Sequence, residues 1–252
     1  MKRTITASLL AISAGLTAMP AAAQDVSVSV SVDYVTEYVF RGATLAQDAI
    51  QPGVELGVGD FYVGGWFSAA FGETSIFADD EFDLYAGYGF ELSDTVALDV
   101  GATYYHYPQG PGGFFASDGG GTDGTYEVYG GLGLDTVLAP SVYAFYDFDL
   151  KNFTLEGSVG HAFESTGPAS FELGLTAGLV DGRDGFSYEY AQATAAVNYA
   201  FTDDVSVYAS ANYAAASEDN FLDGDFDFDT FEPDFEFTDD TVFFAFGISA
   251  GF

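Results

Sequence analysis

The chain has 252 residues, and its 39 acidic side chains against 5 basic ones give a formal charge of −34 at neutral pH. This acidity excludes a nucleic-acid-binding protein, because almost nothing is present to neutralise phosphates. The absence of cysteine excludes a disulfide scaffold, a thiolate metal site and a cysteine nucleophile. A hydrophobic fraction of 48% excludes a disordered acidic protein.

The first 23 residues have the composition of a secretory signal peptide. Lys2 and Arg3 precede an apolar stretch over residues 7–16, and Pro20 is followed by three alanines. This pattern predicts residues 1–23 as a signal peptide, cleaved after Ala23. A transmembrane anchor is the alternative, but it needs a longer and unbroken apolar segment.

The remaining chain, residues 24–252, alternates between apolar and polar side chains with period two. The alternation begins at Val26 and recurs up to Phe252. Period two indicates β-strands with one apolar and one polar face. We predict twelve strands, over residues 26–39, 50–58, 60–70, 81–91, 95–107, 125–135, 141–149, 152–163, 169–180, 186–201, 204–215 and 240–252.

The connections between these strands are unequal in length. Short ones follow the even-numbered strands, at residues 59–60, 92–94, 136–140, 165–168 and 202–203. Longer ones follow most odd-numbered strands, at residues 41–49, 71–80, 108–124, 181–185 and 216–239, with a short exception at 150–151. Short turns at one end and longer loops at the other are typical of outer-membrane proteins. We therefore predict an all-β fold, a single up-and-down antiparallel transmembrane β-barrel. A soluble periplasmic barrel or sandwich is the alternative, although it does not explain the aromatic outer face.

In such a barrel the apolar face contacts lipid and the polar face lines the interior. Seven acidic residues on seven strands fall on the polar face and are predicted to line a pore: Glu55, Asp83, Asp99, Glu127, Asp147, Glu156 and Glu172. The basic residues Arg41, Lys151 and Arg183 all fall at or beside the loop end, so we expect no Lys or Arg to pair with these acids. Unpaired carboxylates are tolerated in a water-filled lumen but not in a dry core.

This interior predicts a channel for passive diffusion of small cationic or neutral solutes, with carboxylates that favour cations. A structural or interaction barrel that does not conduct is the alternative. Aromatic residues near strand ends are predicted to form the interfacial girdles: Tyr34, Tyr38, Tyr104, Phe153, Tyr199 and Phe201.

The loop over residues 216–240 interleaves acids with phenylalanines and is predicted to be extracellular. An EF-hand that started at Asp223 would need Gly and Glu where Phe228 and Asp234 stand. We therefore expect a solvated hairpin that extends the last two strands and attracts cations. A specific divalent site, or divalent bridging to lipopolysaccharide, stays open as an alternative.

Neither an active site nor a cofactor is predicted. His106 and His161 both fall in phase with the lipid-facing residues, and Ser165 lacks the Gly-x-Ser-x-Gly elbow of a hydrolase. A nucleophile, a base and an orienting group cannot be assembled, so we predict that the protein is not an enzyme.

Several short motifs resemble those of known outer-membrane proteins. Phe252 closes an alternating last strand and resembles the C-terminal signal that the barrel assembly machinery reads. The Asp-Tyr…Phe-Arg-Gly pattern and the later Tyr-x-Gly-x-Trp pattern resemble the TorF-type porin family, long described as conserved hypothetical proteins. The motif residues are Asp33, Tyr34, Arg41, Gly42, Tyr62 and Trp66. The run after Gly42, Ala-Thr-Leu-Ala-Gln, departs from the family pattern. The resemblance implies a barrel in the bacterial outer membrane, with lipid and lipopolysaccharide as its surroundings.

Overall fold

A computed structural model describes residues 26–71, 80–117, 123–163, 165–227 and 232–252. The predicted signal peptide, residues 1–23, lies outside the described residues. Within the described ranges, no helix is long and apolar enough to cross a membrane.

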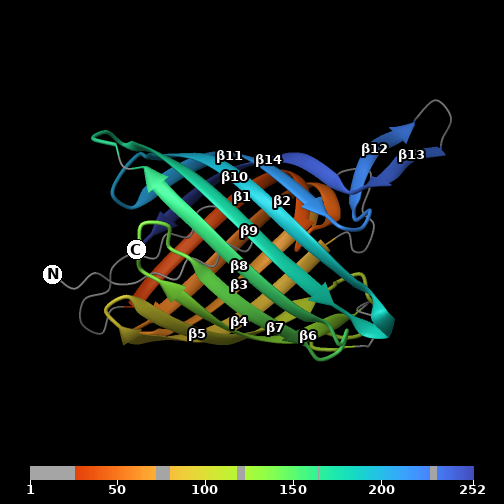
Figure 1. Ribbon diagram of the computed structural model, residues 1–252, viewed down its shortest axis with the longest axis horizontal. Coiled ribbons are helices and arrows are strands. Elements are labelled where there is room, and N and C mark those ends of the chain that lie inside the picture. The colour runs from red at the N-terminus through yellow and green to blue at the C-terminus, as the bar shows by residue number, and fades with distance from the viewer. Residues whose placement is uncertain (1–25, 72–79, 118–122, 164, 228–231) are drawn as a thin grey trace.

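The chain forms a closed barrel of twelve antiparallel strands (Figure 1), which confirms the predicted fold. The barrel strands are β1 (Val26–Phe40), β2 (Ala43–Val58), β3 (Phe61–Ala70), β4 (Asp80–Ser93), β5 (Val96–His106), β6 (Gly124–Leu134), β7 (Ser141–Asp147), β8 (Phe153–Phe163), β9 (Ala169–Asp181), β10 (Ser187–Ala200), β11 (Val205–Ala216) and β14 (Asp240–Gly251). Consecutive barrel strands are neighbours, and β1 pairs with β14 to close the sheet. Closure leaves no unpaired edge, which is what a sheet needs within lipid.

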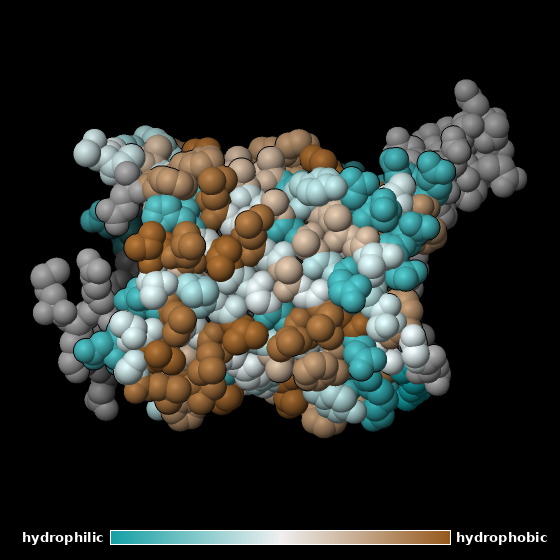
Figure 2. All heavy atoms as spheres, in the orientation of Figure 1, coloured by the Kyte–Doolittle hydropathy of each residue, from teal (hydrophilic) through white to brown (hydrophobic). Residues whose placement is uncertain are grey.

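The outer and inner faces of the barrel differ as the alternation predicts. On β9, Phe171, Leu173 and Leu175 are exposed, whereas the residues between them are half-buried. Figure 2 shows apolar residues spread over the barrel surface, with hydrophilic residues gathered at the end that carries β12 and β13. We call this the loop end, and the opposite end, where β1 begins and β14 ends, the turn end.

The first two strands depart from the prediction, because residues 41–49 are not a loop. β2 begins at Ala43, so Arg41 and Gly42 alone make the turn after β1. Both have positive φ, 50° and 75°. Two-residue hairpin turns with positive φ at both positions match the twist of the strands and favour glycine at the second.

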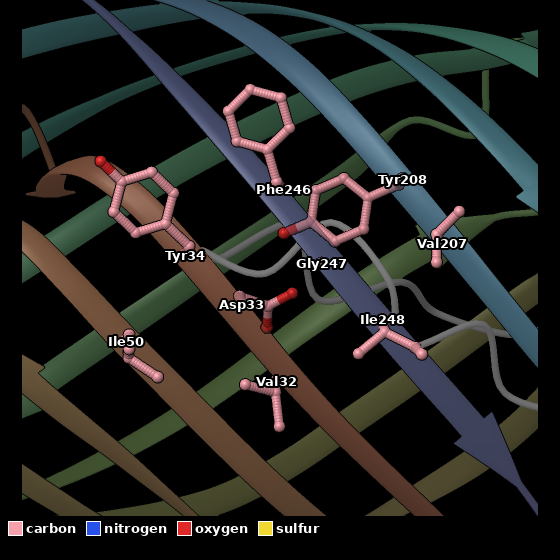
Figure 3. Close-up of a pocket in the computed structure, with 9 residues that line it drawn as sticks. All are labelled: Val32, Asp33, Tyr34, Ile50, Val207, Tyr208, Phe246, Gly247 and Ile248. Atoms are coloured by element: carbon pink, nitrogen blue, oxygen red, sulfur yellow. The ribbon is translucent and has the colours of Figure 1, made fainter.

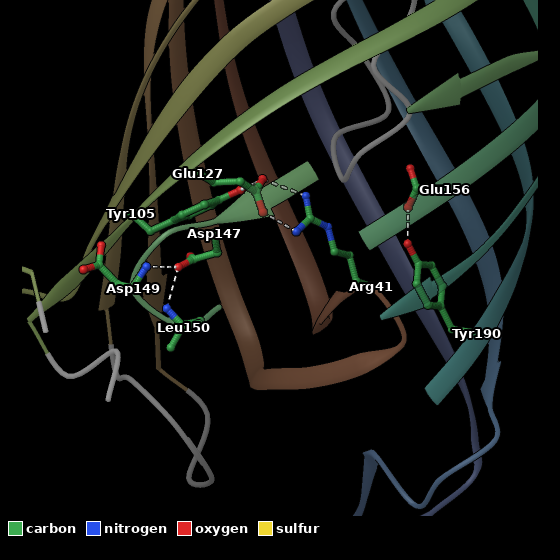
Figure 4. Close-up of polar contacts among 8 residues, drawn as sticks. All are labelled: Arg41, Tyr105, Glu127, Asp147, Asp149, Leu150, Glu156 and Tyr190. Carbon is green, nitrogen blue, oxygen red and sulfur yellow. Dashed lines mark hydrogen bonds and ion pairs between the residues drawn. The ribbon is translucent and has the colours of Figure 1, made fainter. Parts of the chain in front are cut away.

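The end of this hairpin leaves the barrel wall. The β1–β14 ladder ends at Val35↔Ala245, and the β2–β3 ladder begins at Ala49↔Ala70. Between these points the two strands pair with each other, and a register shift at Tyr38/Val39 marks an irregularity of the kind that bends a strand. We call residues 37–48 the inner hairpin, because its tip crosses the barrel interior (Figure 4).

Tyr38 belongs to the inner hairpin and does not lie in the barrel wall. It was predicted for the interfacial girdle, but it is buried inside the barrel, where its hydroxyl donates to Glu81 at 3.0 Å. The girdle prediction is therefore wrong for this residue, because the strand bends away from lipid before reaching it.

The acidic loop forms a small sheet of its own. β12 (Phe221–Asp227) and β13 (Glu232–Thr238) pair as a separate two-stranded hairpin that projects from the loop end (Figure 1). The expectation that the last two barrel strands extend through this loop is therefore wrong. Phe221, at the base of β12, is fully buried at 0% exposure against Val39 and Phe243.

Candidate functional site

The predicted acidic residues lie on the inner face of the barrel strands. Asp83, Asp99, Glu127 and Asp147 are buried, whereas Glu55, Glu156 and Glu172 are half-buried. Each alternates with neighbours on the lipid-facing side of its strand. The inner face therefore concentrates negative charge within a closed barrel.

Four inner-face carboxylates share one arrangement that spans three adjacent strands. In each case a tyrosine on one strand and a carboxylate on another lie directly opposite the same glycine on the strand between them. The rows are Tyr85–Gly64–Glu55, Tyr143–Gly131–Asp99, Tyr190–Gly178–Glu156 and Tyr208–Gly247–Asp33. We call them the tyrosine–glycine–carboxylate rows.

The glycine in each row makes room for the tyrosine ring. A methyl group built on Gly64 would lie 2.3 Å from Tyr85 Cζ, and one on Gly178 would lie 2.5 Å from Tyr190 Cζ. Both distances are shorter than any real contact, so the rings lie across the glycines against the wall. Only glycine permits this close approach.

The tyrosine hydroxyls reach the carboxylates beyond the glycines. Tyr85 donates to Glu55 at 3.2 Å, Tyr143 to Asp99 at 3.3 Å, and Tyr190 to Glu156 at 2.5 Å. In the fourth row, Tyr208 and Asp33 approach each other over Gly247 (Figure 3). The first three rows thus fix an acidic group on the inner wall and supply it with a hydrogen-bond donor.

Asp99 receives a second tyrosine from the other direction. Tyr62 donates to Asp99 at 2.9 Å, and its oxygen lies 2.5 Å from the hydroxyl of Tyr129. These two rings come from β3 and β6 and meet above the opposed pair Gly87 and Gly101, where a methyl group would lie 2.1 Å and 2.3 Å from a tyrosine hydroxyl. Asp99 is therefore held by two tyrosines.

Arg41 contradicts the expectation that no basic residue pairs with the interior acids. Its guanidinium binds Glu127 through two bonds, Nη1 to Oε2 at 2.6 Å and Nη2 to Oε1 at 2.8 Å (Figure 4). It also lies 4.1 Å from the ring centroid of Phe145 and 4.6 Å from that of Phe40. The expectation fails because Arg41 sits at the tip of the inner hairpin and not on a rim loop.

The inner hairpin also covers a buried acid that sequence reasoning did not select. Glu81 accepts from Tyr38 and lies two residues before Asp83 on the same buried face of β4. Its position in phase with Asp83 at the start of the predicted strand was the available signal. Trp66 packs against Tyr38 with ring centroids 5.4 Å apart.

The Asp147 carboxylate accepts hydrogen bonds from the backbone of the turn that follows it. Its Oδ1 accepts from the backbone N–H groups of Asp149 and Leu150, at 2.8 and 2.7 Å (Figure 4). Glu172 lies near the turn end of β9, opposite Ala162 and Ala196. These two acids thus belong to the inner face without belonging to a tyrosine–glycine–carboxylate row.

Most motif residues face the barrel interior, where each contacts partners from other strands. Asp33, Arg41, Tyr62 and Trp66 make the interior contacts described above, and a methyl group built on Gly42 would lie 2.3 Å from Tyr190 Cβ. Tyr34 differs, since it donates to Asp48 at 2.5 Å and stacks with Phe71 and Phe246. Phe252 exchanges two backbone hydrogen bonds with Val28 of β1, at 2.9 and 3.0 Å.

The histidines make structural contacts. His106 is buried against Phe114, with ring centroids 4.6 Å apart, and the Nδ1 atom of His161 lies 2.8 Å from the Val137 carbonyl oxygen. Across the described ranges, no group of three or more acidic or histidine side chains is placed to hold a metal ion.

Comparison with known proteins places this barrel in a family. A family model described as a bacterial protein of unknown function (Gcw_chp) matches residues 18–222. The chain belongs to this family. No curated protein matches the sequence.

Solved structures with a similar fold are outer-membrane porins and channels. The KdgM porin has a TM-score of 0.57 at 10% identity, covering 89% of this chain and 99% of that one. An outer-membrane channel from Pseudomonas putida F1 has a TM-score of 0.54 at 11% identity, covering 96% and 100%. The NanC porin has a TM-score of 0.52 at 13% identity, covering 88% and 98%. The chain therefore has a porin-like outer-membrane barrel fold.

Proposed function

We propose that this protein is a channel of the bacterial outer membrane through which small cationic or neutral solutes diffuse passively, with a preference for cations. The observation that carries the proposal is the charge of the inner face. Several strands contribute carboxylates there, whereas Lys151 and Arg183, the described basic residues besides Arg41, are exposed. An acidic lumen concentrates cations and excludes anions.

The tyrosine–glycine–carboxylate rows favour a conducting channel rather than a barrel with a filled core. They hold the tyrosine rings across glycines of the wall, which keeps these rings out of the middle of the barrel. In a dry, filled core the same carboxylates would be costly, because one tyrosine hydroxyl does not offset the removal of a charged carboxylate from water.

The placement in the outer membrane and the passive mode of transport rest on the porin-like fold. The resemblance to TorF-type porins fits the same assignment. We extend the proposal to residues 24–252 as the mature barrel with an extracellular acidic loop at 216–240. In this proposal Phe252 serves the barrel assembly machinery, lipid and lipopolysaccharide surround the barrel, and the protein has no enzymatic activity.

A non-conducting structural barrel is the second candidate, and the inner hairpin is the observation that favours it. Arg41 reaches across the interior to Glu127, and the two side chains are 12% and 4% exposed. A hairpin in that position narrows any passage through the barrel.

Conductance in planar lipid bilayers separates the two candidates. The channel proposal predicts stable ionic currents from the folded wild-type barrel. The triple substitution Glu55→Gln, Asp99→Asn and Glu156→Gln should keep the barrel folded and lower its preference for potassium over chloride. A barrel that folds but carries no current would favour the structural candidate and overturn the proposal.

A further inference from the structure

The inner hairpin is fixed from two sides. At its tip, Arg41 binds Glu127 of β6 and lies over the ring of Phe145 of β7. Behind it, the buried Phe221 packs against Val39, and the backbone N–H of Thr44 donates to the carbonyl of Asn220 at 3.0 Å. The hairpin is therefore held inside the barrel by contacts with both the wall and the base of the acidic loop.

The tip of the hairpin reaches the far side of the barrel. In the closed strand order β7 lies opposite β1, so a contact from the β1–β2 turn to Phe145 spans the interior. Gly42 rests on Tyr190 of β10, where a methyl group would lie 2.3 Å from Cβ. Tyr190 also lies across Gly178 and donates a hydrogen bond to Glu156. The hairpin tip therefore packs against one of the tyrosine–glycine–carboxylate rows.

We infer that the inner hairpin forms the constriction of the lumen and that Arg41 sets the charge at this constriction by neutralising Glu127. The inference rests on the proposed function, because it assumes that the lumen conducts. Arg41 and Glu127 together carry no net charge, so the cation preference of the wild type comes from the remaining acids. Removing either member leaves one unit charge at the point where passing ions come closest.

The two single substitutions should shift selectivity in opposite directions. Arg41→Gln leaves Glu127 unpaired and should raise the potassium-to-chloride permeability ratio, whereas Glu127→Gln leaves Arg41 unpaired and should lower it. In water, Coulomb's law gives roughly a twofold change in the local concentration of an ion about 8 Å from one added charge. Since cations and anions respond in opposite senses, the ratio should change by roughly fourfold in each variant.

Three further variants isolate the position of the charge. The double variant Arg41→Gln with Glu127→Gln buries no unpaired charge and should restore a ratio close to that of the wild type. Arg183→Gln removes an exposed basic residue at the loop end and should have no effect. Glu172→Gln removes an inner-face acid near the turn end and should shift the ratio less than Glu127→Gln, because salt screens charges beyond about 10 Å.

A second measurement follows the hairpin itself. Trp66 is the single tryptophan of the chain and packs against Tyr38 of the hairpin. If Arg41 holds the hairpin in place, Arg41→Gln should increase quenching of Trp66 fluorescence by acrylamide, and Arg183→Gln should not.

The outcomes separate this inference from the proposed function. A conducting wild type whose selectivity is the same in Arg41→Gln, Glu127→Gln and Arg183→Gln overturns the inference alone. A silent wild type with a conducting Arg41→Gln variant supports the constriction and overturns the proposed function of the wild type. If no variant conducts, the proposed function fails and the selectivity role of Arg41 fails with it.

Discussion

Substitution of Gly178 by alanine tests the tyrosine–glycine–carboxylate rows, because the same strand provides a matched control. Gly178 and Gly174 both lie on the inner face of β9. A methyl group on Gly178 would lie 2.5 Å from Cζ and from the hydroxyl oxygen of Tyr190. A methyl group on Gly174 would meet nothing closer than Thr194 Cβ and the Val159 carbonyl oxygen, both at 3.9 Å.

The expected change in stability follows from these contacts. Gly178→Ala must displace the Tyr190 ring, and overpacking of this kind costs about 1–3 kcal/mol. The displaced hydroxyl also loses Glu156, and a hydrogen bond to a charged group contributes about 1.5–3 kcal/mol. We therefore expect a loss of roughly 2.5–6 kcal/mol for Gly178→Ala. Gly174→Ala should be neutral or stabilising by up to about 1 kcal/mol, since alanine restricts the unfolded chain.

Equilibrium unfolding in urea, with the protein folded in lipid vesicles, measures both variants against the wild type. The fraction folded is read from the mobility difference between folded and heated barrel on a gel. The reasoning is refuted if the two alanine variants lose the same stability, or if Gly178→Ala loses none. Either result would mean that the Tyr190 ring does not lie across Gly178.

Three other variants test separate parts of the structure by the same unfolding measurement or in cells. Tyr190→Phe should keep its ring in place but lose about 1.5–3 kcal/mol with the bond to Glu156, whereas Tyr199→Phe on the exposed outer face should change little; equal effects would argue against the row. Gly42→Ala should cost at least about 1–2 kcal/mol, because its φ of 75° disfavours alanine, and Gly89→Ala, with no side chain nearby, should cost less. Deletion of Phe252 should reduce the amount of folded barrel recovered from cell envelopes, and undiminished recovery would remove its predicted role in assembly.

The strands of the barrel could be predicted because lipid imposes a strict pattern on them. Every lipid-facing position must be apolar, so Phe171, Leu173 and Leu175 on β9 alternate with Glu172 and Gly174. The predicted boundaries of β9, 169–180, differ from the observed Ala169–Asp181 by one residue. Wherever a strand touches lipid on one side, its phase can be read from the sequence.

The inner hairpin could not be predicted by the same rule. Tyr38 and Val39 are neighbours, and they are 5% and 2% exposed because both faces of the hairpin contact protein. Alternation is lost where lipid is absent, so residues 41–49 resembled a loop. Because these residues resemble a loop, the sequence places Arg41 at the rim and its pairing with Glu127 is missed.

The tyrosine–glycine–carboxylate rows were hidden for a different reason. The sequence shows that Tyr190, Gly178 and Glu156 each fall on an inner face, but not that they lie side by side. Their alignment depends on the registers of β10 with β9 and of β9 with β8. Turn geometry fixes those registers, and period-two alternation alone does not distinguish registers that differ by two residues.

The central claim is that an acidic barrel lumen passes cations, and the reversal potential of the wild-type channel under a potassium chloride gradient tests it most directly. Because the inner face is acidic, we expect a reversal potential close to the equilibrium potential of potassium. A reversal potential near the chloride value, from a barrel shown to be folded, would contradict the claim.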